Sequence, residues 1–274
     1  MEELSRIQSR LESLEELDNL VGALRSMAGV RAGEARTALA GTRTYCAVVE
    51  EAIARVAPLA RVREPGRAEG GAGALVVVTS ENGFVGGFNT RLVENALAIR
   101  APGERLLVVG RRGRITANEQ GTEPEGDFAM ASRATAVTPL ARRLARTLED
   151  AVTARLLFAR TQGAGDFESV AQDILPPPGP KPEGEPAAAP PLIQIEPELL
   201  MARLASEYLF AKLADGLMES LASESLARLK TMDAASRKIE EKVARLQRDA
   251  HIAQQEKTTA DLLDVIIGSE AARR

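Results

Sequence analysis

The sequence predicts an α/β protein whose two ends form a long antiparallel coiled coil beside a small domain with a mostly parallel sheet. Three observations predict this fold. All fourteen prolines lie from Pro58 to Pro197, so both ends lack the residue that breaks helix interiors. Apolar residues in both ends recur in steps of three and four. Between the ends, short apolar runs stop at glycine-rich or polar turns, as buried parallel strands do.

The C-terminal helix is expected over residues 197–271. From Glu198 to Ile267 the chain has no proline and a single glycine, Gly216. At about 1.5 Å per residue this is a rod of roughly 100 Å, which is longer than a compact domain of this size is wide. Its apolar positions have the spacing of a coiled-coil seam: Ile239, Val243, Leu246, Ala250 and Ala253, with Leu226, Leu229 and Met232 upstream.

The N-terminal helix is expected over residues 1–57. Neither terminal stripe is wide enough to build a core alone, so each helix needs a partner. The simplest partner is the opposite end of the chain, and a homodimeric coiled coil is the structural alternative. The N-terminal stripe begins in one phase and continues after a phase slip: Leu4, Ile7, Leu11 and Leu14, then Leu17, Val21, Leu24 and Met27.

The middle of the chain, residues 70–195, has the pattern of a small Rossmann-like domain. ALVVV at 74–78 and RLLVVG at 105–110 are typical of buried parallel strands, and FNTRLVENALAIR between them is typical of a connecting helix. The other expected elements are a helix at Pro139–Val152, strands at 154–161 and 167–175 that can form a hairpin across GAGD, and a proline-rich loop at 176–191.

The composition fits a soluble protein with a hydrophobic core. Hydrophobic residues make up 45% and charged residues 27%, while the net charge of −4 gives no argument for nucleic-acid binding. No apolar stretch is long enough to span a bilayer, and the opening residues carry no apolar signal core. Cys46 and His251 are the single cysteine and histidine, so we expect no internal disulfide, no metal site of cysteine and histidine ligands and no catalytic pair.

The loop SENGFVGGFNTRL at 80–92 raises the question of nucleotide binding, because it follows a predicted strand and precedes a helix. Its glycines lack the G-x-G-x-x-G spacing of dinucleotide sites and the lysine of a P-loop. Arginines at 111, 112 and 114 follow the second strand, where we expect an exposed basic turn. The glycines are explained by a tight turn and close helix–sheet packing. We therefore expect no active site and no cofactor.

Five short segments, taken in order, carry a family resemblance. SENGFVGGFN at 80–89 resembles the motif S-x-x-G-L-C-G-G-x-N, and AGTRTY at 40–45 resembles A-x-x-R-P-Y. IEP at 195–197, with ESLASE at 219–224, is similar to E-P…E-N-x-A-S-E. ARLKTMDAAS at 227–236 and TADLLDVIIG at 259–268 are similar to A-R-x-x-A-M-x-x-A-T and T-x-E-L-x-E-I-V-x-G. These are motifs of the gamma subunit of F-type ATP synthases, and the resemblance covers nearly the whole chain.

The resemblance implies a rotor shaft, the central stalk of a rotary motor. It implies that the tips, residues 1–32 and 245–274, enter a hexamer of alpha and beta subunits, and that the central domain rests on the membrane c-ring beside epsilon. The subunit would be non-catalytic, with catalysis on beta, and peripheral at the cytoplasmic face of the bacterial inner membrane. The implied site residues fall in three sets: Arg31, Gln254, Gln255 and Thr259 for the hexamer; Ile193, Ile195 and Glu196 for the c-ring and epsilon; Gly83, Gly86, Gly87 and Asn89 in the family-marker loop.

The chain also departs from the family pattern. Gln254 stands where the family has an arginine that meets a beta-subunit loop, while Gln255 and Thr259 match. The departures are those of a divergent gamma, such as one from an alternative ATPase operon. Two other functions stay open on the residues alone: a homodimeric coiled-coil tether and a Rossmann-type nucleotide-binding enzyme. Whether protons or sodium ions are moved, and whether ATP is made or hydrolysed, does not follow from the sequence.

Overall fold

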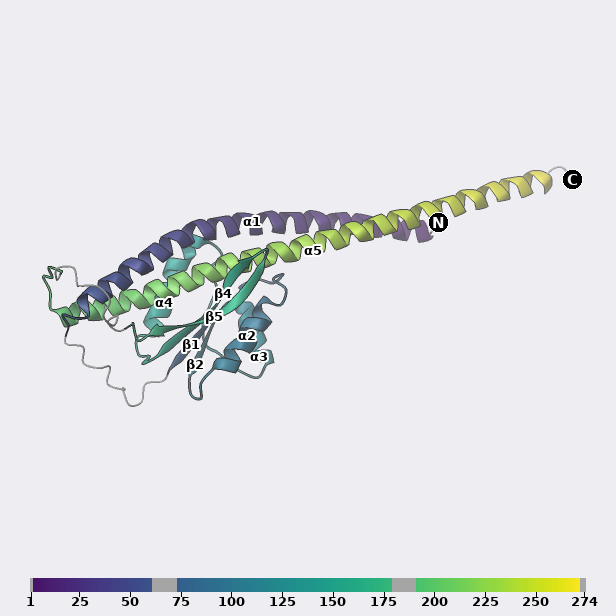
Figure 1. Ribbon diagram of the computed structural model, residues 1–274. Helices are drawn as coiled ribbons and strands as arrows, with labels where there is room; N and C mark the ends of the chain where they lie inside the picture. The colour runs from purple at the N-terminus through teal and green to yellow at the C-terminus, as the bar shows by residue number, and fades with distance from the viewer. Residues whose placement is uncertain (1, 61–72, 179–190, 272–274) are drawn as a thin grey trace. The chain divides into compact units, whose positions relative to one another are not determined.

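The computed structural model describes residues 2–60, 73–178 and 191–271 (Figure 1). The chain divides into two compact units: residues 28–229, here the α/β unit, and residues 1–27 with 230–274, here the helical unit. Two long helices belong to both units. They are α1, Glu2–Val56, and α5, Pro197–Ala271. The proline-rich loop expected at 176–191 lies mostly outside the described residues.

The α/β unit contains a five-stranded sheet in the order β3-β2-β1-β4-β5. The strand pairs β1–β2, β1–β4 and β2–β3 are parallel, and β4–β5 is an antiparallel hairpin. The mostly parallel sheet predicted from the sequence is therefore confirmed. The strands are β1, Ala74–Val78; β2, Arg105–Val109; β3, Glu125–Phe128; β4, Ala154–Gly163; and β5, Asp166–Leu175.

Helices cover both faces of this sheet. Because successive strand residues point to opposite faces, β1 gives Val76 and Val78 to one core and Leu75 and Val77 to the other. The first core contains side chains of α1, α4 and the central part of α5, and the second contains the buried face of α2. The shorter helices are α2, Phe88–Ile99; α3, Arg111–Glu119; a 3₁₀ turn, Ala134–Ala136; and α4, Val137–Thr147.

Three details of the sequence prediction for this unit were wrong. The arginines at 111, 112 and 114 begin helix α3 and do not form a basic turn. Neither α3 nor the edge strand β3 was predicted, because α3 buries only Gly113 and Ala117 and β3 buries only Phe128, which leaves no apolar period to detect. Helix α4 ends at Thr147, earlier than the predicted Val152.

Within the α/β unit, α1 and α5 lie side by side and run in opposite directions. The Thr42 hydroxyl donates to Asp215 Oδ1 at 3.1 Å, and farther along α1 the Cys46 thiol donates to the Ala211 carbonyl at 3.3 Å. Higher residue numbers in α1 are therefore paired with lower residue numbers in α5, as in an antiparallel pair. An ion pair between Glu50 and Lys212, 2.5 Å long, is a further contact between the two helices. The antiparallel pairing predicted from the sequence is confirmed.

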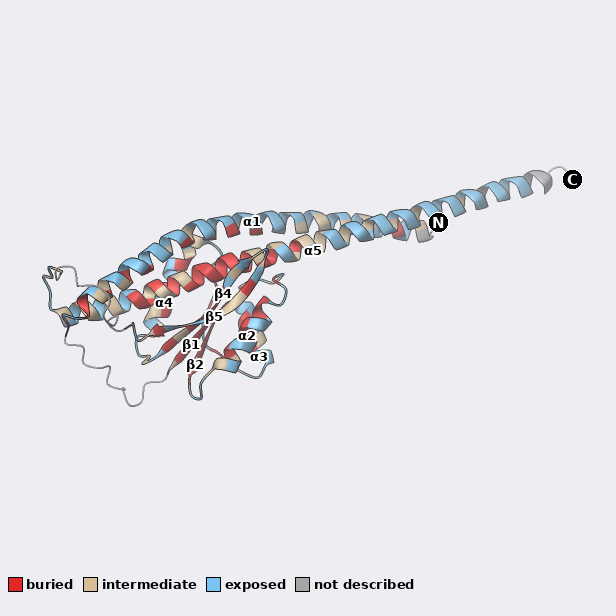
Figure 2. Cartoon of the chain, in the orientation of Figure 1, coloured by how far each residue is buried: buried red, intermediate tan, exposed pale blue. Residues whose placement is uncertain are grey.

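The helical unit contains the start of α1 and the end of α5. All five seam residues predicted for α5, from Ile239 to Ala253, are half-buried, while most residues between them are exposed (Figure 2). The phase slip predicted in α1 was wrong. Val21 and Leu24 of the predicted stripe are half-buried, but Leu17 and Met27 are about half exposed, at 49% and 50%, and Asp18 and Ala28 take their places in the seam. The seam therefore keeps its spacing of three and four residues, with a polar residue at the Asp18 position. A search for apolar residues alone cannot recognise a seam position that is polar.

Candidate functional site

The carboxyl edge of the sheet is the place where this fold would hold a ligand. The strand order 3-2-1-4-5 is that of dinucleotide-binding sheets, in which ligands bind at the switch point beyond the carboxyl ends of the first and fourth strands. The predicted loop, residues 80–87, leaves β1 at this edge. The contacts made there decide whether the edge is open.

Helix α5 packs against this part of the sheet. The Ser220 hydroxyl donates to the carbonyl of Val78, the last residue of β1, at 3.4 Å, and the Ser223 hydroxyl donates to Ala159 of β4 at 3.0 Å. Gly216 permits the close approach, because a Cβ there would lie 2.4 Å from Leu156 Cδ2. Side chains of the protein itself therefore lie over β1 and β4 next to the switch point.

The family-marker loop is held by contacts within the chain. Asn89, at the start of α2, accepts a hydrogen bond from the Ser80 backbone N–H at 2.9 Å. The Arg228 guanidinium donates to the carbonyls of Gly83 at 3.2 Å and Asn82 at 3.3 Å. The backbone angle φ of Gly86 is +59°, a value that residues other than glycine rarely adopt. Gly87 immediately precedes α2. These contacts favour the packing role that the sequence predicted for the glycines.

A carboxylate of the same loop occupies the N-terminus of α3. Glu81 Oε2 accepts hydrogen bonds from the backbone N–H groups of Arg111, at 3.1 Å, and Met130, at 3.0 Å. Unpaired N–H groups at a helix N-terminus attract anions, and phosphates bind to them in nucleotide sites. Here the anion is a side chain of the protein, so the geometry favours a sealed edge over a phosphate site.

A buried ion pair joins the loop to α5. Glu224 is 4% exposed and accepts a hydrogen bond from Arg228, itself 6% exposed, at 2.7 Å. Burial raises the pKa of Glu224, and the positive charges of Arg228 and Arg31 act in the opposite direction. Arg31, predicted as a hexamer contact, is therefore half-buried on α1 where its charge also acts on the core. The sequence did not reveal this burial, since a glutamate four residues before an arginine usually lies on a solvated helix face.

Two neighbouring carboxylates of α5, the buried Glu219 and the half-buried Asp215, lie between α1 and α5. Glu219 pairs through Oε1 with Arg43, while its Oε2 has no hydrogen-bond partner among the described residues. Asp215 lies one turn before Glu219 and accepts the bond from Thr42. Burial is the largest cause that raises the pKa of Asp215; the bond from Thr42 lowers it, and the charge of Glu219 raises it.

We expect Asp215→Asn to stabilise the protein at neutral pH. An acid whose pKa is higher in the folded state contributes stability below its unfolded pKa, about 4, and that contribution is lost as pH rises through the folded pKa. Asparagine keeps the oxygen that accepts from Thr42 and carries no charge. The melting temperature of the variant should exceed that of the parent at pH 7, and the difference should disappear toward pH 4. Asp173→Asn, at an exposed carboxylate, is the control, and equal melting temperatures at pH 7 would contradict the assignment.

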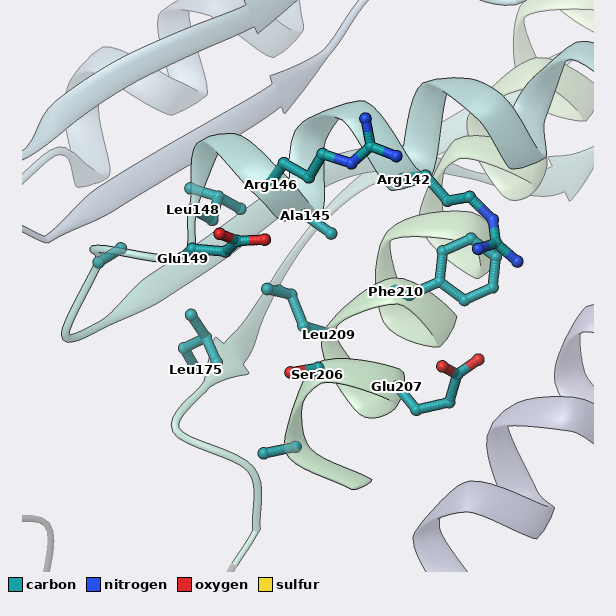
Figure 3. A pocket seen from close by; sticks show the side chains of 12 residues that line it. Arg142, Ala145, Arg146, Leu148, Glu149, Leu175, Ser206, Glu207, Leu209 and Phe210 are labelled. Atoms are coloured by element: carbon teal, nitrogen blue, oxygen red, sulfur yellow. The ribbon is translucent and has the colours of Figure 1, made fainter. Parts of the chain in front are cut away.

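A shallow groove of about 330 Å³ lies between α4 and α5 (Figure 3). Its apolar residues include Leu148, Leu175 and Leu209, and the guanidinium of Arg142 lies 5.0 Å from the ring of Phe210. Its charged residues are two arginines and two glutamates, Arg142, Arg146, Glu149 and Glu207. With balanced charges and no buried polar group directed into it, the groove does not define a ligand.

The other predicted site residues lie near the start and the end of α5. Ile193, Ile195 and Glu196 immediately precede α5, and the Glu196 carbonyl accepts from Leu200 N at 3.0 Å. Gln254, Gln255 and Thr259 are exposed on the helical unit, and the Thr259 hydroxyl donates to the Gln255 carbonyl at 2.9 Å. The first set belongs to the α/β unit and the second to the helical unit.

The family resemblance assigned the tip at 245–274 to the hexamer, but sequence reasoning did not name its exposed apolar side chains as contact residues. Six large apolar side chains there are more than half exposed: Ile252, Leu262, Leu263, Val265, Ile266 and Ile267. The signal was present, since the run LLDVII places apolar residues on several faces of a helix, which one partner helix cannot cover. Exposed apolar surface of this kind is typical of regions that contact another protein.

No three acidic, histidine or cysteine side chains among the described residues are grouped so that they could hold a metal ion. No described helix contains a segment long and apolar enough to cross a membrane. A sheet whose carboxyl edge is packed with the protein's own side chains, and two long paired helices of which one exposes an apolar end, are features that favour a protein acting through contacts with other subunits.

Solved structures share this fold. A chain of the Euglena gracilis mitochondrial ATP synthase, solved as OSCP/F1/c-ring, matches with a TM-score of 0.64 at 16% identity, over 98% of this chain and 94% of that chain. A chain of the Tetrahymena thermophila mitochondrial ATP synthase, in a structure of central stalk and c-ring, matches with a TM-score of 0.58 at 17% identity, over 79% and 99%. At these identities the likeness establishes the fold.

The family follows from the sequence comparisons. The ATP synthase family model matches residues 3–272, so the chain belongs to this ATP synthase family. The ATP synthase gamma chains of Anaeromyxobacter sp. and Nitratidesulfovibrio vulgaris are each 28% identical to it, over the whole length of both chains. The gamma-subunit family predicted from the sequence motifs is confirmed.

Proposed function

We propose that the chain is the rotating gamma shaft of an F-type ATP synthase, turning inside a hexamer of alpha and beta subunits and coupling ion flow through the c-ring to ATP synthesis or hydrolysis. The observation that carries the proposal is the antiparallel α1–α5 pair, whose α5 end exposes apolar side chains from Ile252 to Ile267. Full-length likeness to gamma chains and the shared fold of ATP synthase chains support it.

In this proposal the exposed residues of the chain make the contacts with the other subunits. The tips, 1–32 and 245–274, meet the hexamer, with Gln254, Gln255 and Thr259 supplying neutral polar contacts. Exposed polar contacts are each worth no more than about 1 kcal/mol, so no single hexamer orientation is held too tightly for rotation. The α/β unit and the residues before α5, including Ile193, Ile195 and Glu196, face the c-ring and epsilon.

The shaft in this proposal changes which conformation of a neighbouring site is favoured and lowers no chemical barrier. A rotor that contacts the beta subunits differently at each angle shifts each site between states of different nucleotide affinity. Catalysis would take place on the beta subunits. The complex would be peripheral, at the cytoplasmic face of the bacterial inner membrane, and a divergent gamma of this kind fits an alternative ATPase.

The test is reconstitution of the full chain with the alpha and beta subunits of its own organism. We expect a stable complex whose ATP hydrolysis drives rotation of the chain. A homodimer with no affinity for alpha and beta would support the tether instead, and measurable binding of ATP or NAD by the chain alone would support the Rossmann-type enzyme.

In the same complex, Gln254→Arg is expected to raise the rotational torque or the ATPase rate. The variant restores the cation that the family pattern has at this exposed position of α5. Gln120→Arg adds the same charge to an exposed position of the α/β unit and serves as the control. If both variants behave like the parent, the contact with the beta subunit lies at other residues in this chain.

A further inference from the structure

Phe84 presents its aromatic ring to solvent from the loop between β1 and α2. The residue is 66% exposed, and its backbone angle φ is +63°. Residues with a Cβ rarely adopt this left-handed region, and a bulky side chain is strained there where glycine would not be. Since the exposed ring gains little from packing within the chain, the stability of the fold does not explain a phenylalanine at this position.

The chain fixes the loop on both sides of Phe84. Before it, the Arg228 guanidinium donates to the carbonyls of Asn82 and Gly83. After it, Val85 is 5% exposed and packs in the core that contains the buried face of α2. Strained conformations persist where the surrounding structure determines them in this way, and they cluster at functional sites. The loop therefore holds the ring outward in a fixed position.

We propose that Phe84 is a contact residue whose ring inserts into an apolar pocket of a partner subunit. A ring that is already held in its bound position loses little conformational freedom on binding, and aromatic side chains contribute a large share of the binding energy of many protein interfaces. Burial of the ring in the complex offsets the backbone strain that Phe84 carries in the free chain. The contacts of Arg228 and Val85 then serve to position the ring.

The position of the loop along α5 indicates the partner. Arg228, which holds the loop, lies about 46 Å along α5 from Pro197, the first residue of the helix, at about 1.5 Å per residue. In the proposed complex the residues before Pro197 face the c-ring and epsilon, whereas the helical unit, which begins again at residue 230, carries the tips that enter the hexamer. Phe84 is therefore assigned to an alpha or beta subunit of the hexamer, and this assignment rests on the proposed function.

The experiment compares the stability of the free chain with its binding to the immobilised hexamer of alpha and beta subunits from its own organism. Phe84→Gly removes the ring and relieves the strain. The melting temperature of the free chain should therefore rise by about 2 °C, while binding to the hexamer should weaken about tenfold because burial of the ring is lost. The two effects have opposite signs only if the side chain serves a contact outside the chain.

Ala164→Gly is the matched control. Among the residues that the structure describes, Ala164 is the second residue other than glycine with a positive φ, at +50°, and it lies exposed between β4 and β5. This substitution relieves strain of the same kind without removing a ring. It should raise the melting temperature by a similar amount and leave the binding unchanged.

Two further variants keep the test decisive if Phe84→Gly fails to fold. Phe84→Leu and Phe84→Ser both keep a Cβ and therefore the strain, so their melting temperatures should be close to that of the parent. Leucine can still fill an apolar pocket and should retain most of the binding, whereas serine should lose about tenfold. Equal binding by these two variants, or parental binding by Phe84→Gly, would overturn the proposal. If the parent chain itself does not bind the hexamer, the proposed function is wrong, and Phe84 has no partner of the kind named here.

Discussion

Replacing Arg228 by methionine is expected to lower the free energy of unfolding of the α/β unit by about 3–5 kcal/mol. The guanidinium is the hydrogen-bond partner of Glu224 Oε1 at 2.7 Å and donates to two carbonyls of the 80–87 loop. Methionine keeps much of the volume but leaves the Glu224 carboxylate buried without its counter-ion. A buried carboxylate in that position must either take up a proton or draw in water, and both cost free energy.

Urea unfolding followed by circular dichroism measures the effect. Arg112→Met, at an exposed position of α3, should change the free energy of unfolding by less than about 0.5 kcal/mol. Replacing Glu224 and Arg228 together by methionine removes both charges and should recover most of the loss. If Arg228→Met stays within about 1 kcal/mol of the parent, the pair is more hydrated than its 4% and 6% exposure indicates.

The long-range architecture could be predicted because it follows from patterns that extend over many residues. Proline-free ends, the seam of α5 and the apolar runs of β1 and β2 each repeat one physical requirement several times. Short elements at the surface contain no such repeated pattern. Helix α3 buries two small residues, so its sequence, RRGRITANE, has no apolar face to recognise.

The sites were harder to predict, because each depends on which polar residues become buried. Glu224 and Arg228 have the spacing of a solvated helix pair, and only the sheet and loop around them show that they are enclosed. The stripe of α1 was predicted to pass through Leu17 and not through Asp18, because seams are recognised by apolar residues; the partner of Asp18, Ser236, lies on a helix far away in the sequence. Contacts of this kind are set by the tertiary structure and leave no local period.

Gly113→Ala is expected to destabilise the α/β unit by about 3 kcal/mol, although alanine is the better helix former. A Cβ at this position of α3 would lie 2.1 Å from Thr79 Oγ1 and 2.4 Å from Thr79 Cβ. Thr79 cannot easily move, since it is β-branched and fully buried, and its hydroxyl donates to the Val109 carbonyl at 2.6 Å. Helix α3 is held as well, because it begins directly after Gly110, whose φ is +103.

The same substitution in α1 should have the opposite sign, which separates the clash from helix propensity. A Cβ at Gly33 would meet nothing within 4 Å, so Gly33→Ala should stabilise the chain by up to about 1 kcal/mol through propensity alone. Both variants are measured by urea unfolding under the same conditions. A gain in stability for Gly113→Ala would mean that α3 can move away from β1 without cost. Since α3 carries the N–H of Arg111 that binds Glu81, such a movement would also loosen the contact that closes the carboxyl edge of the sheet.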